Sequence, residues 1–89
     1  MVYLITYDLH RPGQNYTGLH LALKGLGEWA HPLESVWLVN SSLSATDIYN
    51  RLAPEIDKND NILVTAMGRD HQGWLPAWAW TWINSRVYA

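Results

Sequence analysis

The sequence contains no cysteine, and this absence excludes several kinds of site. Without a thiol, the 89 residues can form no disulfide, no cysteine nucleophile and no cysteine-ligated zinc site. Phenylalanine is also absent, whereas six Trp and five Tyr are present. Trp and Tyr carry a polar group on an apolar ring, so they suit interfaces and stacking surfaces as well as cores.

Charged residues are scarce as well. They make up 16% of the chain, whereas a typical globular domain has about 25%. The six basic residues are scattered and the net charge is −2, which argues against tight non-specific binding to a nucleic-acid backbone. The low charge instead predicts that part of the surface is covered, most simply by a second copy, so we expect a homodimer.

No stretch of the sequence is long and apolar enough to span a bilayer. The N-terminal apolar run has no basic segment before it and ends at Asp8, so no signal peptide is predicted. We therefore expect a cytoplasmic protein that does not bind membranes. The length supports a single domain, with a core at 1–68 and a C-terminal extension at 69–89 that packs on the core or on a partner subunit.

The apolar pattern of the core predicts two helices and four strands. The strands are expected at 2–7, 29–33, 35–40 and 62–67, and the helices at 17–27 and 44–56. This order is the ferredoxin-like βαββαβ arrangement, an α+β fold in which both helices cover one face of an antiparallel sheet. The first and last strands are the most apolar, so we expect both in the buried part of the sheet.

Capping residues mark the predicted helix ends. Ser44 and Asp47 have the spacing of a capping box, and Pro54 should shorten the helix that follows them. The first helix is expected to begin at a cap formed by Asn15 or Thr17.

The Trp-rich extension is read as a helix that starts at Pro76. Trp74, Trp78 and Trp82 would then share one face, while the alternation of Trp with small residues also fits a strand. The extension or a second subunit should cover the sheet face that carries no helix. The Trp side chains are then interface or core residues, or alternatively a platform on which bases stack.

The end of the first strand carries the main candidate site. Asp8 ends a rigid strand and His10 follows two residues later, so both are candidate catalytic residues and Asp8 is a candidate metal ligand. The next polar residues lie at a helix start, which favours an anion such as phosphate. We expect substrate contacts from Arg11, Gln14, Asn15 and Tyr16. The alternatives are an Asp8 that caps a turn or pairs with Arg11, an exposed His10 and a loop closed by Asn15 as the helix cap.

Three more residues are candidates for substrate binding. Ser35 lies at the bend between the second and third strands, where turn formation is the competing role. Arg69 and His71 follow the last strand, beside Asp70. If this strand ends at the same side of the sheet as the first, Asp70 and His71 should lie near Asp8.

Three segments resemble a known family of small proteins. They are YLITYDL at Tyr3–Leu9, PGQNY at Pro12–Tyr16 and PLESVWLV at Pro32–Val39, and DNILVTAMG at Asp60–Gly68 is placed where the family has its fourth strand. Together they are similar to the ferredoxin-fold group that includes the second CRISPR-associated protein (Cas-two), the VapD toxins and, above all, the SinR-like proteins. The resemblance covers Val2–Gly68 and leaves out the Trp-rich extension.

The resemblance implies a symmetric dimer in which Asp8 approaches its counterpart. The two carboxylates would hold a divalent metal, most simply Mg²⁺, for cleavage of RNA or DNA by a metal-dependent endoribonuclease or phosphodiesterase. The negative net charge departs from a protein that processes duplexes. Two alternatives remain: a non-catalytic binder of a nucleotide or signalling molecule, and a protein-interaction module that uses the Trp-rich extension.

Overall fold

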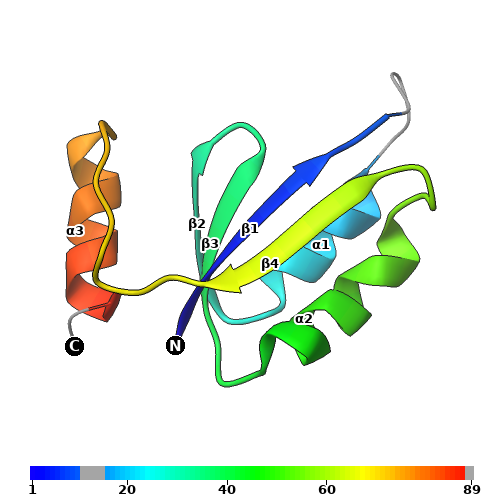
Figure 1. The fold of residues 1–89 in the computed structure, drawn as a ribbon, viewed down its shortest axis with the longest axis horizontal. Coiled ribbons are helices and arrows are strands. Elements are labelled where there is room, and N and C mark those ends of the chain that lie inside the picture. Colours follow the sequence, from blue (N-terminus) through cyan, green and yellow to red (C-terminus); the bar gives the residue numbers. More distant parts are fainter. Residues whose placement is uncertain (11–15, 88–89) are drawn as a thin grey trace.

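The computed structural model describes residues 1–10 and 16–87. It has an α+β fold with a four-stranded antiparallel sheet and three α-helices (Figure 1). The elements are β1 (Val2–Asp8), α1 (Thr17–Lys24), β2 (Glu28–Leu33), β3 (Val36–Asn40), α2 (Ala45–Leu52), the 3₁₀ turn η1 (Ala53–Glu55), β4 (Asn61–Ala66) and α3 (Ala77–Val87). The predicted α+β class is confirmed, and the arrangement is compatible with a ferredoxin-like fold.

The strand order in the sheet is β2-β3-β1-β4, and every neighbouring pair is antiparallel. β1 therefore occupies an interior position, as its apolar sequence predicts. The prediction that the last strand is buried in the sheet is wrong, because β4 is an edge strand with β1 as its neighbour. Leu63 in β4 is 57% exposed, so an apolar sequence did not identify an interior strand here.

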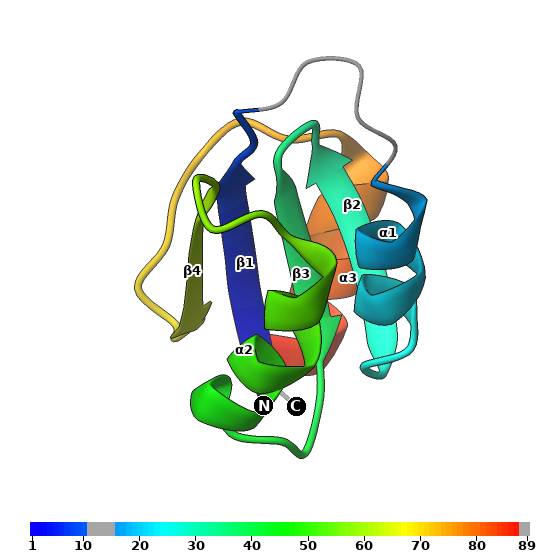
Figure 2. The same cartoon turned by 90° about the vertical axis from the view of Figure 1, so that its right-hand side faces the viewer.

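Helices lie on both faces of the sheet. α1 and α2 cover one face, and α3 lies against the other (Figures 1 and 2). Because successive residues of a strand point to opposite faces, β1 contributes to both layers. Tyr3 and Ile5 belong to the core beneath α1 and α2, whereas Val2 and Leu4 belong to the core beneath α3.

The ends of α1 and α2 follow from local chemistry. The Ser44 hydroxyl accepts a hydrogen bond from the Asp47 backbone N–H at 3.1 Å, which confirms the predicted cap of α2. The helix stops at Leu52, and Pro54 lies in the tighter turn η1. Thr17 is not the cap of α1, because it is already helical and Tyr16 holds the cap position. Asn15 lies outside the described residues.

The extension forms α3 immediately after Pro76, but the expected Trp face is not the buried one. Trp74 is 97% exposed and Trp78 is 52% exposed, whereas Ala79 and Ile83 are buried against the sheet. The small Ala79 side chain lets α3 lie close to the sheet, and the indoles of Trp80 and Trp82 pack at the margin of this contact. No described helix has the length and apolar character needed to cross a membrane.

A salt bridge joins α3 to β2, which is the edge strand on the side of the sheet away from β4. The Arg86 guanidinium donates to the Glu28 carboxylate of β2 at 2.8 Å and lies 4.4 Å from the Trp82 ring centroid. This hydrogen bond, together with one from the Asn40 side chain, lowers the pKa of Glu28 below its ordinary value.

Candidate functional site

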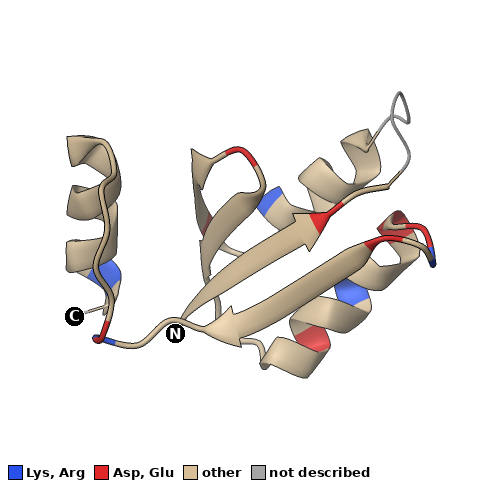
Figure 3. Cartoon of the chain, turned by 45° about the horizontal axis from the view of Figure 1, so that its top comes forward, with Lys and Arg blue, Asp and Glu red and all other residues tan. Residues whose placement is uncertain are grey.

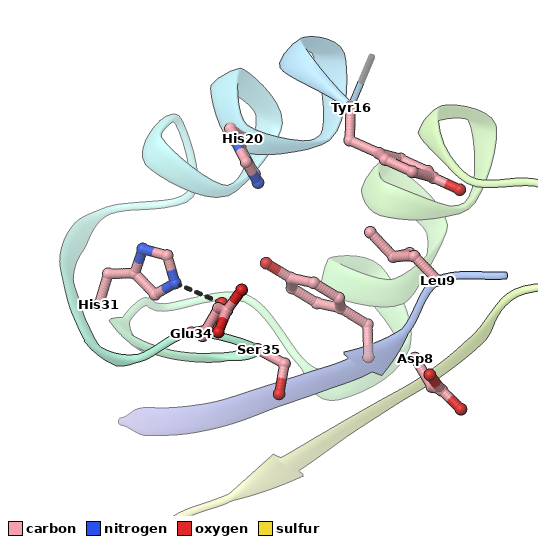
Figure 4. A pocket seen from close by; sticks show the side chains of 8 residues that line it. Asp8, Leu9, Tyr16, His20, His31, Glu34 and Ser35 are labelled. Atoms are coloured by element: carbon pink, nitrogen blue, oxygen red, sulfur yellow. Dashed lines mark hydrogen bonds between the residues drawn. The ribbon is translucent and has the colours of Figure 1, made fainter. Parts of the chain in front are cut away.

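A cleft of about 540 Å³ opens at the carboxyl end of β1, on the face of the sheet that carries α1 (Figure 4). Residues of β1, the start of α1 and the β2–β3 hairpin border it. The lining residues are Tyr7, Asp8, Leu9, Tyr16, His20, His31, Glu34 and Ser35. Binding pockets for small molecules typically measure about 300–1,000 Å³, so this cleft is large enough for a ligand of nucleotide size.

Trp37 is a buried residue that contacts three of the residues lining the cleft, namely Tyr7, His20 and His31. It is 2% exposed because the alternation of β3 turns it, together with Val39, towards the core beneath α1 and α2. Its indole N–H donates to the Tyr7 hydroxyl at 3.0 Å. The His31 ring stacks on Trp37 with centroids 4.0 Å apart, and the His20 ring lies 5.7 Å from the same indole.

The hydrogen bond of His31 fixes which of its nitrogens carries the proton. Its Nε2 lies 2.8 Å from the carbonyl oxygen of Glu34, which can only accept, so Nε2 is the donor (Figure 4). In the neutral ring, Nδ1 is therefore a hydrogen-bond acceptor. No hydrogen bond from a described residue holds the His20 ring, which points from α1 towards the cleft.

Asp8 borders the cleft, but its carboxylate turns away from it. Tyr7 faces α1, so the next residue of the strand faces the side of the sheet that carries α3. The Asp8 side chain is 73% exposed, and its Oδ2 lies 3.5 Å from Nε2 of His10. The same nitrogen lies 3.3 Å from the Asn61 side-chain amide. The structure thus brings Asp8 and His10 together, outside the cleft.

Asp60 connects several segments at this end of the molecule, although no local pattern in the sequence marks it as a site residue. Its carboxylate accepts hydrogen bonds from the His10 backbone N–H at 2.8 Å, the Asp57 backbone N–H at 2.9 Å and the Tyr16 hydroxyl at 3.1 Å. The hydrogen bond from His10 is the main cause of a lowered pKa at Asp60. The ferredoxin-like order could have revealed it, because that order places the start of β4 beside the end of β1.

Acidic side chains surround the start of α1. The Glu55 carboxylate lies against Gly18 in the first turn, and Tyr16 at the cap position contacts Asp60. Figure 3 shows acidic residues gathered where β1 ends and β4 begins. The expected phosphate site at this helix start is therefore disfavoured by negative charge. Of its expected contact residues, Arg11, Gln14 and Asn15 lie outside the described residues.

The remaining expected site residues divide between the cleft and another part of the surface. Ser35 and Tyr16 line the cleft. His71 instead lines a groove beside α3, stacks on Trp80 at 6.1 Å and donates Nδ1–H to the Gly68 carbonyl. Asp70 and His71 do not follow a strand that ends beside Asp8, so that prediction is wrong. β4 is antiparallel to β1, and the last residues of β4 lie beside the first residues of β1. Arg69 precedes them in the same exposed segment.

One copy of the chain does not offer a complete metal site within residues 1–10 and 16–87. No three His, Asp or Glu side chains there are arranged to share an ion. Mg²⁺ favours carboxylate oxygens with water and phosphate, and Asp8 supplies a single carboxylate beside an imidazole. A magnesium site at Asp8 therefore needs further oxygen ligands, such as Asp8 of a second copy.

Comparison with known proteins does not extend these observations. The sequence matches no protein-family model, and a search of curated proteins finds no significant similarity.

Proposed function

We propose that the protein binds a nucleotide or a short stretch of nucleic acid in the cleft at the carboxyl end of β1. The observation that carries the proposal is the composition of the cleft: Tyr7, His20 and His31 present a hydroxyl and two imidazoles to one space of nucleotide size. Tyr16 and Ser35 complete its border. These groups can donate and accept hydrogen bonds to base edges, sugar hydroxyls and phosphate oxygens.

The charge of the cleft limits the ligands that it accepts. Asp8 and Glu34 are acidic, and no Lys or Arg is among the described lining residues. Contacts with bases and sugars must therefore contribute more to binding than attraction of phosphate does. This favours a mononucleotide, a cyclic dinucleotide or a single-stranded segment over a duplex, which is bound largely through its backbone.

The proposal is tested by measuring binding of fluorescently labelled single-stranded RNA, single-stranded DNA, duplex DNA and a cyclic dinucleotide in EDTA. The variant His31→Ala removes a ring that borders the cleft, and Trp78→Ala removes an exposed ring on α3 as the matched control. We expect at least about tenfold weaker binding for His31→Ala, equivalent to about 1.4 kcal/mol, and unchanged binding for Trp78→Ala. Equal binding by His31→Ala and the parent protein, or no binding of any probe, would overturn the proposal.

A metal-dependent endonuclease of the Cas-two-like type is the second candidate, and the position of Asp8 favours it. Its carboxylate is 73% exposed on the sheet face near β4, where a shallow depression is lined by Thr6, Asp8, Asn61 and Leu63, among others. A second copy that docked there would bring two Asp8 carboxylates together, and a divalent cation would relieve their repulsion.

The two candidate functions differ in whether they require a divalent metal ion. The nuclease should cleave RNA or DNA in Mg²⁺, lose cleavage in EDTA and lose it in the Asp8→Asn variant. Binding in the cleft should survive both EDTA and Asp8→Asn, because the carboxylate points away from the cleft. Absence of metal-dependent cleavage with the parent protein would eliminate the nuclease candidate alone.

A further inference from the structure

Two imidazoles border the cleft and differ in how they are held. His31 is oriented on both sides, by stacking on Trp37 and by the hydrogen bond from Nε2 to the Glu34 carbonyl. His20 comes from α1 and faces the same space (Figure 4). The two rings lie 4.0 and 5.7 Å from the same indole centroid, so their separation cannot exceed the sum of these distances.

We infer that His31 and His20 form an acid–base pair that cleaves RNA without a metal ion. The inference rests on the proposed function, because RNA must first bind in the cleft. Acid–base cleavage needs one group that accepts a proton and another that donates one. Imidazole serves either role near neutral pH, and the Nε2–H bond of His31 leaves its Nδ1 lone pair available as the base.

The reaction balances with these two groups alone. His31 Nδ1 takes the proton of a ribose 2′-hydroxyl, whose oxygen forms a bond to the adjacent phosphorus. The bond from phosphorus to the 5′ oxygen breaks as protonated His20 donates its proton to that oxygen. The products are a 2′,3′-cyclic phosphate and a 5′-hydroxyl, and no oxidant or reductant takes part.

The other groups that line the cleft favour cleavage of phosphodiester bonds inside an RNA chain over reaction at a terminal phosphate. The Tyr7 hydroxyl accepts from the Trp37 indole, so its own proton is left to donate to a phosphate oxygen. The other titratable lining residues are Asp8, Glu34 and Tyr16. The Glu34 carboxylate repels a doubly charged terminal phosphate more strongly than a singly charged phosphodiester, so the substrate class is internal RNA phosphodiesters.

The test uses a short labelled RNA in excess EDTA and a matched oligonucleotide that is 2′-deoxy throughout. We expect a product with a 2′,3′-cyclic phosphate, and cleavage that rises and then falls with pH because one ring must be neutral and the other protonated. His20→Gln and His31→Gln should each slow cleavage by about 10²–10⁴-fold and remove one limb of the pH profile. His71→Gln, which changes a Trp-stacked imidazole outside the cleft, should cleave at the rate of the parent protein.

Each outcome distinguishes the inference from the proposed function. If the deoxy oligonucleotide binds but RNA stays intact in EDTA, the acid–base pair is refuted and cleft binding stands. If neither oligonucleotide binds, both are refuted. Cleavage that requires Mg²⁺ and disappears in Asp8→Asn also refutes the pair and supports the second candidate. Circular dichroism of each variant shows whether a loss reflects unfolding, and RNA cleavage by a folded His20→Gln and His31→Gln double variant at the parent rate overturns the inference.

Discussion

The backbone N–H of His10 donates a hydrogen bond of 2.8 Å to the carboxylate of Asp60, fifty residues further along the chain. This contact joins the end of the interior strand β1 to the turn that begins the edge strand β4. The Asp57 N–H and the Tyr16 hydroxyl bind the same carboxylate, so one side chain connects three segments near the cleft. Asp60 is 9% exposed, which makes replacement of these bonds by water difficult.

Asp60 should make the free energy of unfolding depend on pH in the acidic range. Donation from the His10 N–H, more than any other cause, lowers its pKa in the folded protein below the ordinary value of 3.8. The unfolded chain therefore takes up the proton first, so this stabilisation is present above the unfolded pKa and is lost as pH falls through the folded pKa.

The Asp60→Asn variant tests this relationship. It should melt at a lower temperature than the parent protein at pH 7, because the amide nitrogen would face an N–H donor. The difference in melting temperature should shrink as the pH falls below about 4, since the parent then loses its charged carboxylate. Glu28, whose pKa is also lowered, is present in both proteins and cancels from the difference. A difference that stays constant with pH would show that the charge of Asp60 contributes nothing.

The packing of α3 on the sheet predicts a contrast between two apolar residues of the extension. Ile83 is fully buried beside Val2 and Leu38, whereas Trp74 is 97% exposed. Ile83→Ala should lower the free energy of unfolding by about 2–5 kcal/mol. Trp74→Ala should change it by less than about 0.5 kcal/mol, although the deleted side chain is larger. Urea unfolding followed by far-ultraviolet circular dichroism measures both, and equal effects would contradict the packing of α3 described above.

Gly27 is the residue that permits the connection between α1 and β2. Its φ is +154°, and an added Cβ would meet the backbone carbonyl oxygen of Asn40. Gly27→Ala should therefore cost about 1–3 kcal/mol of stability. Gly68→Ala is the matched control, because a Cβ there meets no atom within 4 Å. A thermal unfolding experiment in which the two variants behave alike would rule out the proposed close approach at Gly27.

Local signals in the sequence predicted the elements well because neighbouring residues determine them. The cap at Ser44, the bend at Ser35 and the shortening of α2 near Pro54 all depend on groups within a few residues. The position of β4 in the sheet was predicted wrongly because a local pattern carries no information on strand pairing. Its composition says that it is a strand, whereas its edge position depends on which strands pair with it.

The candidate site was less predictable, because it depends on contacts between distant segments. The sequence drew attention to Asp8 and to the loop that follows it, and the structure turns the Asp8 carboxylate away from the cleft. His20 and His31 are not among the residues that the sequence marks as candidates. Their common feature is Trp37, against which both rings pack from different elements. Periodicity within one segment carries no information about such a meeting.

The exposed Asp8 carboxylate leads to a prediction about assembly. If two copies dock through the sheet face near β4, their Asp8 side chains approach and repel, and a divalent cation bound between them relieves that repulsion. The dimer fraction should therefore rise when EDTA is replaced by Mg²⁺, as measured by sedimentation velocity over a range of protein concentrations. Asp8→Asn removes the repulsion, so its dimerisation should be stronger than that of the parent protein in EDTA and should not respond to Mg²⁺. A metal response that persists in Asp8→Asn would place the cation elsewhere, and a parent protein that stays monomeric under all conditions would remove the shared-carboxylate site.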